Sequence, residues 1–169
     1  GAVAALRSRG AGRGVMGSLA DRIRVPEEFV VAIENALGHH LQLVLAEQPE
    51  AAQSILAELA ESKAGRASVA ALSIEQKDEH QLAFATDIMP RRDGRGVRER
   101  LAKGDVVPAL NVVLAEPSVE KLVKSLLGRT FLTSDLANAT AQIQNGHAGC
   151  DFVTLSGDLL SRHGVYTGG

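Results

Sequence analysis

The sequence contains the same succession of elements twice, and this repeat constrains the fold more than any single motif. The first copy runs through residues 26–73 and the second through residues 117–156. Each copy starts with proline at a predicted helix, continues to Leu-Gly, an apolar run and a second helix, and ends on Ala-Gly, a short apolar run and Leu-Ser. The spacing between the copies shrinks smoothly along the chain, as expected for a duplication with small deletions. A chain with two similar halves can present two similar edges to a partner.

Strands alternate with helices in both copies, which predicts an α/β fold with a small mixed sheet in each half or one shared sheet. Pro26 with Glu27 and Glu28 predicts a helix start, because proline suits the first turn and carboxylates stabilise the positive end of the helix dipole. Gly38 predicts the end of that helix. The predicted helices are 26–36, 51–60, 117–126 and 136–144, and the predicted strands are 17–25, 41–46, 68–71, 109–116, 130–133 and 152–154.

The two copies divide the chain into lobe one at about 14–74 and lobe two at about 106–169. Between them, residues 75–105 match nothing in the other half and are predicted to be a connector, mobile around Gly94 and Gly96. The whole of 1–169 is predicted to act as one domain. Because the chain begins without methionine and ends on two glycines, we expect it to be a piece of a longer protein.

The composition is that of an ordinary globular protein, with 45% hydrophobic and 22% charged residues. A net charge of −2 gives no overall attraction to nucleic acid or membrane, so such binding requires a local patch. No apolar stretch approaches the length of a membrane span. The single cysteine, Cys150, excludes an internal disulfide, fits a reducing compartment and is predicted to be buried beside its apolar run.

The segment from Gly12 to Gly17 fits the pattern G-x-G-x-x-G of dinucleotide sites. Such a site needs a strand before the motif and a helix that opens at its third glycine. Here a basic, glycine-rich segment precedes the motif and a strand is predicted to follow it, which favours a turn. A small nucleotide-binding α/β domain using Gly12–Gly17 therefore stands as the alternative function.

Neither a metal site nor a catalytic centre is predicted. His39 and His40 are adjacent and point to opposite sides of a strand, and the other histidines are isolated, whereas zinc requires several ligands at short spacings. Two serines, an aspartate and a histidine near the C-terminus lack a nucleophile elbow, so residues 156–158 are predicted to be a turn. We therefore expect no cofactor and no enzymatic activity.

A basic stretch from Arg91 to Lys103 has two interpretations. It is a solvated loop, or it contacts phosphates without recognising base sequence. No aromatic residues that could stack on bases lie within it, which argues against specific single-strand recognition. The candidate DNA-binding residues are Arg91, Arg92, Arg95 and Arg98, joined by Arg7, Arg9 and Arg13 if the fold brings them together.

The C-terminal segment 164–169 is rich in glycine, which permits close backbone approach. It is either an edge strand that pairs with another chain or a flexible tail, and the sequence leaves both interpretations open.

Several strings together resemble the hinge domain of SMC (structural maintenance of chromosomes) proteins, and of bacterial or archaeal condensin-type SMC proteins in particular. The similar strings are residues 14–26, 32–38, 41–42, 64–67, 126–128, 153–158 and 167–169, in the family's order and over nearly the whole chain.

The resemblance implies a homodimerising hinge of two similar lobes related by a pseudo-two-fold, which joins two coiled-coil arms. It implies ATP-hydrolysing heads elsewhere in the protein, weak sequence-independent DNA contacts, and a cytoplasmic, nucleoid-associated role in chromosome segregation and condensation. If lobe one of each subunit pairs with lobe two of the other, two equivalent contacts close a ring. The interface residues implied are Gly65, Arg66, Gly164, Val165, Tyr166, Gly168 and Gly169.

Overall fold

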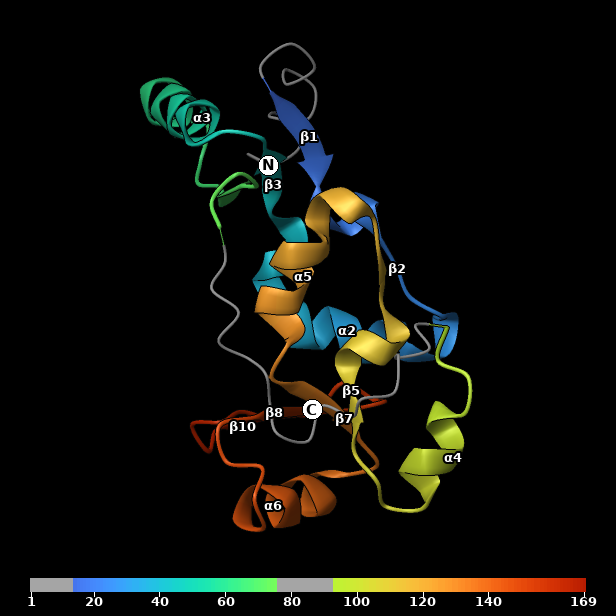
Figure 1. Cartoon of the computed structure of the whole chain (residues 1–169). Coiled ribbons are helices and arrows are strands. Elements are labelled where there is room, and N and C mark those ends of the chain that lie inside the picture. The colour runs from blue at the N-terminus through green and yellow to red at the C-terminus, as the bar shows by residue number, and fades with distance from the viewer. Residues whose placement is uncertain (1–13, 76–92) are drawn as a thin grey trace. The chain divides into compact units, whose positions relative to one another are not determined.

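The computed structural model describes residues 14–75 and 93–169 (Figure 1). The chain forms two compact units, and each is assembled from separate stretches of sequence. In the described part, unit 1 comprises residues 14–23, 39–75 and 116–122, and unit 2 comprises residues 24–38, 93–115 and 123–169. The units are therefore not the sequence repeats, because helix α2 (Val30–Leu37) of the first copy belongs to unit 2.

Unit 1 contains a three-stranded sheet in the order β1-β3-β4, made of β1 (Val15–Ser18), β3 (Val44–Ala46) and β4 (Val69–Ala71). β1 is antiparallel to β3, whereas β4 is parallel to it. Helix α3 (Pro49–Ser62) makes the crossover between the parallel strands. Its buried Ile55 and Leu59 cluster with Val44, and Val69 packs against that cluster.

Unit 2 contains a five-stranded sheet in the order β10-β9-β8-β7-β5. Its strands are β5 (Val107–Pro108), β7 (Thr130–Thr133), β8 (Asp151–Thr154), β9 (Leu159–Leu160) and β10 (Tyr166–Thr167). Only β7 and β8 are parallel, and α6 (Leu136–Gln144) connects them. α6 and α2 lie on opposite faces of this sheet (Figure 1).

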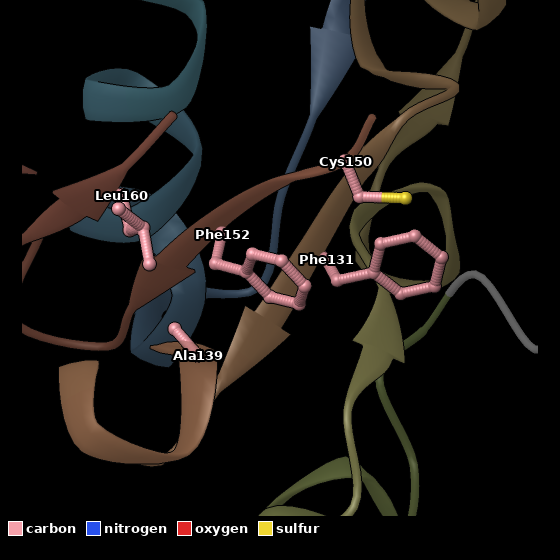
Figure 2. Close-up of a cluster of buried hydrophobic side chains, with 5 residues drawn as sticks. All are labelled: Phe131, Ala139, Cys150, Phe152 and Leu160. Atoms are coloured by element: carbon pink, nitrogen blue, oxygen red, sulfur yellow. The ribbon is translucent and has the colours of Figure 1, made fainter. Parts of the chain in front are cut away.

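The core between α6 and its sheet is small and apolar. Phe131 and Phe152 lie with ring centroids 6.0 Å apart, next to Ala139, Leu160 and Cys150 (Figure 2). The prediction that Cys150 is buried is confirmed, since none of its surface is exposed. Burial raises the pKa of its thiol, which Arg129 partly offsets, so little of it is the reactive thiolate near neutral pH.

The remaining elements are short. They are β2 (Ile23–Arg24), β6 (Leu114–Ala115), α4 (Val97–Ala102), α5 (Glu120–Leu127) and the 3-10 turns η2 (Leu19–Arg22), η3 (Glu27–Phe29), η4 (Gly38–Gln42), η5 (Ala109–Val112) and η6 (Pro117–Val119).

The sheets confirm the repeat and extend it towards the N-terminus of each copy. The order β1-β3-β4 of unit 1 corresponds to β5-β7-β8 of unit 2, with the same antiparallel and parallel pairings. The difference lies beyond the third strand. In unit 2 the hairpin of β9 and β10 continues the sheet, whereas β4 is the last strand of its sheet.

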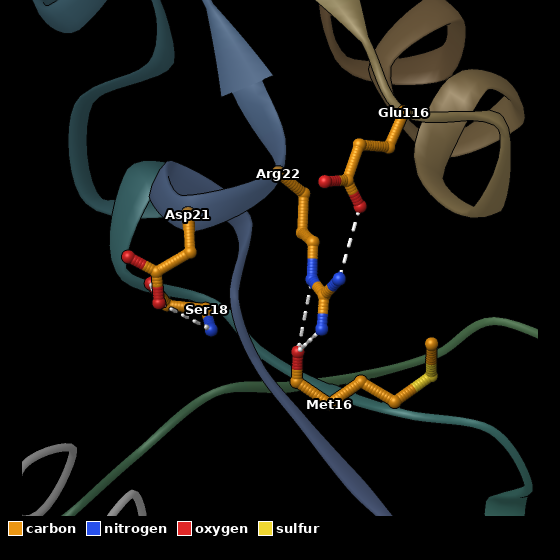
Figure 3. A network of polar contacts seen from close by, with 5 residues as sticks. All are labelled: Met16, Ser18, Asp21, Arg22 and Glu116. Carbon is orange, nitrogen blue, oxygen red and sulfur yellow. Dashed lines mark hydrogen bonds and ion pairs between the residues drawn. The ribbon is translucent and has the colours of Figure 1, made fainter.

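Two predicted strands, of which 17–25 is predicted from its alternating character, are wrong at the same point of each repeat. The predicted strand 17–25 is interrupted by η2, and the first half of the predicted strand 109–116 is occupied by η5. In the first case the Asp21 carboxylate accepts hydrogen bonds from the backbone N–H and the hydroxyl of Ser18, at 3.4 and 3.2 Å (Figure 3). A short polar side chain thus offers the backbone a turn in place of the sheet.

The Arg22 side chain holds this turn in unit 1 (Figure 3). Its guanidinium donates to the Met16 carbonyl oxygen at 2.6 and 3.1 Å and pairs with Glu116 at 3.0 Å. The predicted strand 41–46 is also shorter than expected, because η4 occupies its first residues and β3 begins only at Val44.

The described part of the connector differs from the expected mobile loop. Gly94 is buried, and residues 97–102 form α4, whose Val97 and Leu101 are both 3% exposed. A Cβ at Gly94 would lie 2.5 Å from Cε2 of Phe29, which is itself fully buried. The backbone therefore passes directly over an aromatic ring, and only glycine leaves room for it.

Candidate functional site

Each of the two sheets ends on two edge strands, and none of these has a neighbouring strand on its outer side among residues 14–75 and 93–169. One edge in each unit is suited to a partner strand, namely the outer side of β4 in unit 1 and the outer side of β10 in unit 2. The opposite ends of the two sheets carry features that natural proteins use to block edges. β5 contains Pro108, and β1 has a bulge in its pairing with β3. β4 and β10 lack both features, so they are the edges suited to pairing with another strand.

The backbone of β4 presents hydrogen-bonding groups to the outside. The Ser68 carbonyl accepts from the N–H of Val44 at 3.0 Å, and the Leu72 N–H donates to the Ala46 carbonyl at 2.8 Å. Groups alternate along a strand, so the N–H groups of Val69 and Ala71 point away from β3. The outer side of β4 therefore offers these donors to a further strand.

The backbone of β10 alternates in the same way. The Ser161 N–H donates to the Val165 carbonyl at 2.9 Å, so the backbone carbonyl of Val165 points toward β9. The backbone N–H and C=O of the next residue, Tyr166, therefore point away from β9. The Tyr166 hydroxyl hydrogen-bonds to Thr140 Oγ1 of α6 at 2.6 Å. Val165 and Tyr166 are large apolar side chains, yet they are 57% and 55% exposed. This edge thus combines free backbone groups with uncovered apolar surface.

The predicted interface residues lie at these two edges, in different units. Gly65 and Arg66 are exposed and precede β4. Gly164 forms the turn between β9 and β10, with φ +76 and its N–H donating to the Ser161 carbonyl at 2.9 Å. A Cβ at Gly168 would lie 2.5 Å from Oδ1 of Asp158 in the same chain, so the chain's own Asp158 also requires glycine at this position. Gly169 is exposed at the end of the segment.

A groove of about 270 Å³ lies beside β4, between this strand and the first turns of α5. Most of its lining is apolar, although polar side chains from the α5 side also take part. The apolar lining residues are Ala70, Ala71, Leu72, Ile74, Pro117 and Leu122, and the polar ones are Ser118, Glu120 and Lys121. Ile74 is 54% exposed at its rim. Sequence reasoning missed this groove, because its two walls come from segments more than forty residues apart.

Of the seven candidate DNA-binding arginines, the structure describes only Arg95 and Arg98. The others, Arg7, Arg9, Arg13, Arg91 and Arg92, lie outside the described residues. Arg98 Nε pairs with Oε2 of Glu28 at 2.5 Å, and the neighbouring Arg100 lies 4.0 Å from Asp105. These carboxylates offset much of the positive charge on α4.

The nucleotide motif lacks its required context. From Gly14 onward the chain enters β1, and its third glycine, Gly17, lies inside that strand and not at a helix start. The described residues contain no group of three histidine, cysteine, aspartate or glutamate side chains that could hold a metal ion. Within the same residues, no helix is long and apolar enough to cross a bilayer.

Comparison with known proteins decides the family. Residues 12–143 match the model of the family described as "SMC proteins Flexible Hinge Domain". The chain belongs to the SMC hinge family. The resemblance found in the sequence is thereby confirmed, as is the mixed α/β fold with small sheets and several helices.

Relatives of this SMC hinge domain include chromosome partition proteins of bacteria and archaea. "Chromosome partition protein Smc" of Halothermothrix orenii is 29% identical over 165 residues, which are 97% of this chain but 13% of that protein. The hinge domain therefore spans about an eighth of the length of the curated relatives that it matches.

Two solved hinge structures have the same fold. One is an asymmetric dimer of the Geobacillus stearothermophilus SMC hinge domain, with a TM-score of 0.77, 27% identity, and coverage of 99% of this chain and 64% of that chain. The other is the Pyrococcus furiosus Smc hinge domain with an extended coiled coil, with a TM-score of 0.74, 27% identity, and coverage of 99% and 54%.

Proposed function

We propose that this domain is the homodimerisation hinge of an SMC chromosome-organising ATPase. The observation that carries the proposal is the pair of open edges. β4 ends one sheet and β10 ends the other, and each has outward backbone groups. Strand addition at such an edge gives geometry through main-chain bonds and specificity through alternate side chains. The Geobacillus stearothermophilus SMC hinge domain, whose crystal structure is an asymmetric dimer, supports the same proposal.

A two-fold dimer uses both edges of both chains. β4 of each subunit pairs with β10 of the other, so the two contacts are equivalent and no edge is left over to extend a fibre. Gly65 and Arg66 then lie at the same junction as the partner's 164–169 segment. If one contact breaks, the other keeps the subunits at high effective concentration, and the dimer can open on one side.

The longer protein supplies what this domain lacks. Two coiled-coil arms leave the hinge, as the extended coiled coil of the Pyrococcus furiosus domain suggests, and ATP hydrolysis belongs to head domains and not to this fold. The domain itself has no catalytic role and requires no cofactor. Its place is the cytoplasm, on the nucleoid, in chromosome segregation and condensation, by analogy with the partition proteins that it resembles.

The mass of the isolated domain in solution tests the proposal. Sedimentation velocity and light scattering at micromolar concentration should give twice the chain mass of 17.8 kDa. Mixing two differently tagged preparations should produce a mixed species, because both partners are copies of the same chain. A single species of 17.8 kDa across this concentration range would overturn the assignment.

We further propose weak, sequence-independent DNA contact through the basic end of α4, with Arg95 and Arg98 among the phosphate ligands. Arg95 is exposed there, and the Arg98 side chain is 60% exposed beside Glu28. Because acidic neighbours offset part of this charge, few phosphates are neutralised. The logarithm of the association constant, plotted against the logarithm of the salt concentration, is therefore expected to have a slope of about −2 to −4.

Fluorescence anisotropy with a labelled duplex of arbitrary sequence measures this prediction. Arg95→Glu should weaken binding several-fold, whereas Glu28→Gln should strengthen it because Arg98 is released from its partner. Glu34→Gln, which neutralises an exposed carboxylate on α2, serves as the control. A salt-independent affinity, or the same affinity in all variants, would contradict the proposal.

A further inference from the structure

In unit 2 a further strand, β9, pairs with the outer side of β8. This pairing shows what kind of strand the open outer side of β4 in unit 1 can accept. β8 occupies the place in its sheet that β4 occupies in the other, and β9 covers β8 in antiparallel pairing. β9 places one leucine on each face. Leu160, opposite Phe152, joins the core under α6, and Leu159, opposite Val153, therefore lies on the other face. A strand that covers β4 in the same way brings one apolar side chain to each face.

Tyr166 of β10 and Val165, the residue just before this strand, provide such a pair of side chains. The hydrogen bond to Thr140 places Tyr166 on the α6 face of its sheet. Successive side chains alternate, so Val165 lies on the opposite face. Both are more than half exposed in the single chain, so a large part of the apolar surface of each is available to a partner.

The handedness of the crossovers decides which face of β4 each side chain meets. α3 links parallel β3 and β4, and α6 links parallel β7 and β8, and such connections are right-handed. β10 runs parallel to β8, because both are antiparallel to β9. When β4 joins a partner's β10 in antiparallel fashion, α3 and the partner's α6 therefore fall on the same face of the combined sheet. Tyr166 then lies on the α3 face and Val165 on the other.

The groove is on that other face. Val69 packs against the α3 cluster, so Ala70 and Leu72 point away from α3 and line the groove. The backbone gives the same answer independently. The outward groups of Tyr166 pair with those of Val69 or Ala71, which places Val165 opposite Ala70 or opposite Leu72.

We propose that Val165 of each subunit fills the groove beside β4 of its partner and acts as the apolar anchor of each strand junction. This inference rests on the proposed dimer, and it adds the face and the register of the pairing. A side chain of the partner that enters the groove loses its contact with water. Side chains that are desolvated in this way contribute most of the binding energy of an interface.

Disulfide crosslinking between separate chains tests the face and the register. Preparations of Val165→Cys and Leu72→Cys, differently tagged, are mixed, allowed to exchange and oxidised, and the same is done for Val165→Cys with Ala70→Cys. One of these mixtures should give a covalent mixed dimer on a non-reducing gel. Tyr166→Cys mixed with Leu72→Cys is the matched control, because side chains on opposite faces cannot reach disulfide geometry. The native Cys150 is fully buried and does not compete.

The outcomes separate this inference from the dimer itself. A dimer by light scattering with crosslinks only in the Tyr166→Cys mixture, or with none in any mixture, overturns the placement of Val165 and leaves the hinge assignment intact. A monomeric wild type overturns both. Equal thiol reactivity of Leu72→Cys in the dimer and in a monomeric variant would show that the partner does not cover the groove, and would also overturn the placement.

A charge in the groove gives a second measurement. Val165→Asp should raise the dimer Kd by at least about tenfold, because each junction then buries a carboxylate in an apolar groove. The melting temperature of the monomeric form should change little, since Val165 is 57% exposed in one chain. Val31→Asp, which alters an apolar side chain on α2 that is 47% exposed, should leave the Kd unchanged. Equal effects of the two substitutions would count against the anchor.

Discussion

Replacement of Gly94 by alanine should lower the free energy of unfolding by about 2–5 kcal/mol. Two effects add. At φ +74 an L-residue is in the left-handed region, which disfavours any side chain. The new methyl group would also lie 2.5 Å from Cε2 and 3.2 Å from Cδ2 of Phe29, a ring buried in unit 2 that has no space to retreat. Urea unfolding followed by circular dichroism measures the change.

Gly96 provides the matched control two residues away. It has nearly the same backbone conformation, with φ +79, but no atom lies within 4 Å of a Cβ built there. Gly96→Ala should therefore lose only the conformational part, about 1–2 kcal/mol. Trimming the ring with Phe29→Leu should recover part of the Gly94→Ala loss, since the two changes act on one contact. Equal losses at Gly94 and Gly96 would show that the contact with Phe29 is unimportant.

Replacement of Ala71 by proline should raise the dimer Kd roughly 5- to 150-fold. Proline removes the outward N–H of β4, which has no partner strand within the described chain. One donor is lost at each of two equivalent junctions, at a net loss of about 0.5–1.5 kcal/mol per hydrogen bond. Proline is tolerated at an edge strand, so the fold of unit 1 should persist. Analytical ultracentrifugation over a dilution series measures the Kd.

Ala71→Ser is the control for this experiment, because serine keeps the N–H and adds only one atom. It should dimerise like the wild type. Thermal unfolding of both variants separates an interface effect from a folding defect. A proline variant that melts like the wild type and dimerises with the same Kd would show that β4 is not part of the interface.

Local signals predicted the regular elements well wherever the residues that define an element are neighbours in sequence. β7 spans Thr130–Thr133 and α6 spans Leu136–Gln144, as the apolar run and the helical periodicity indicate. The prediction was wrong where a polar side chain bonds to nearby backbone. Asp21 closes a 3-10 turn inside a stretch whose alternation predicts an uninterrupted strand. Alternation measures burial, and a tight turn with one buried residue satisfies it as a strand does.

The candidate site was likewise predictable from the sequence only in part. The sequence by itself determined the repeat, the family resemblance and the glycine-rich segments at 65 and 164–169, because these are properties of residue order. Only the tertiary structure decided that β4 and β10 are the open edges, that β4 borders a groove, and that Gly94 is packed against Phe29. An open edge is defined by the strand that is missing beside it, and a groove by walls from distant segments. Such features arise from contacts between residues far apart in the chain, which local propensity does not record.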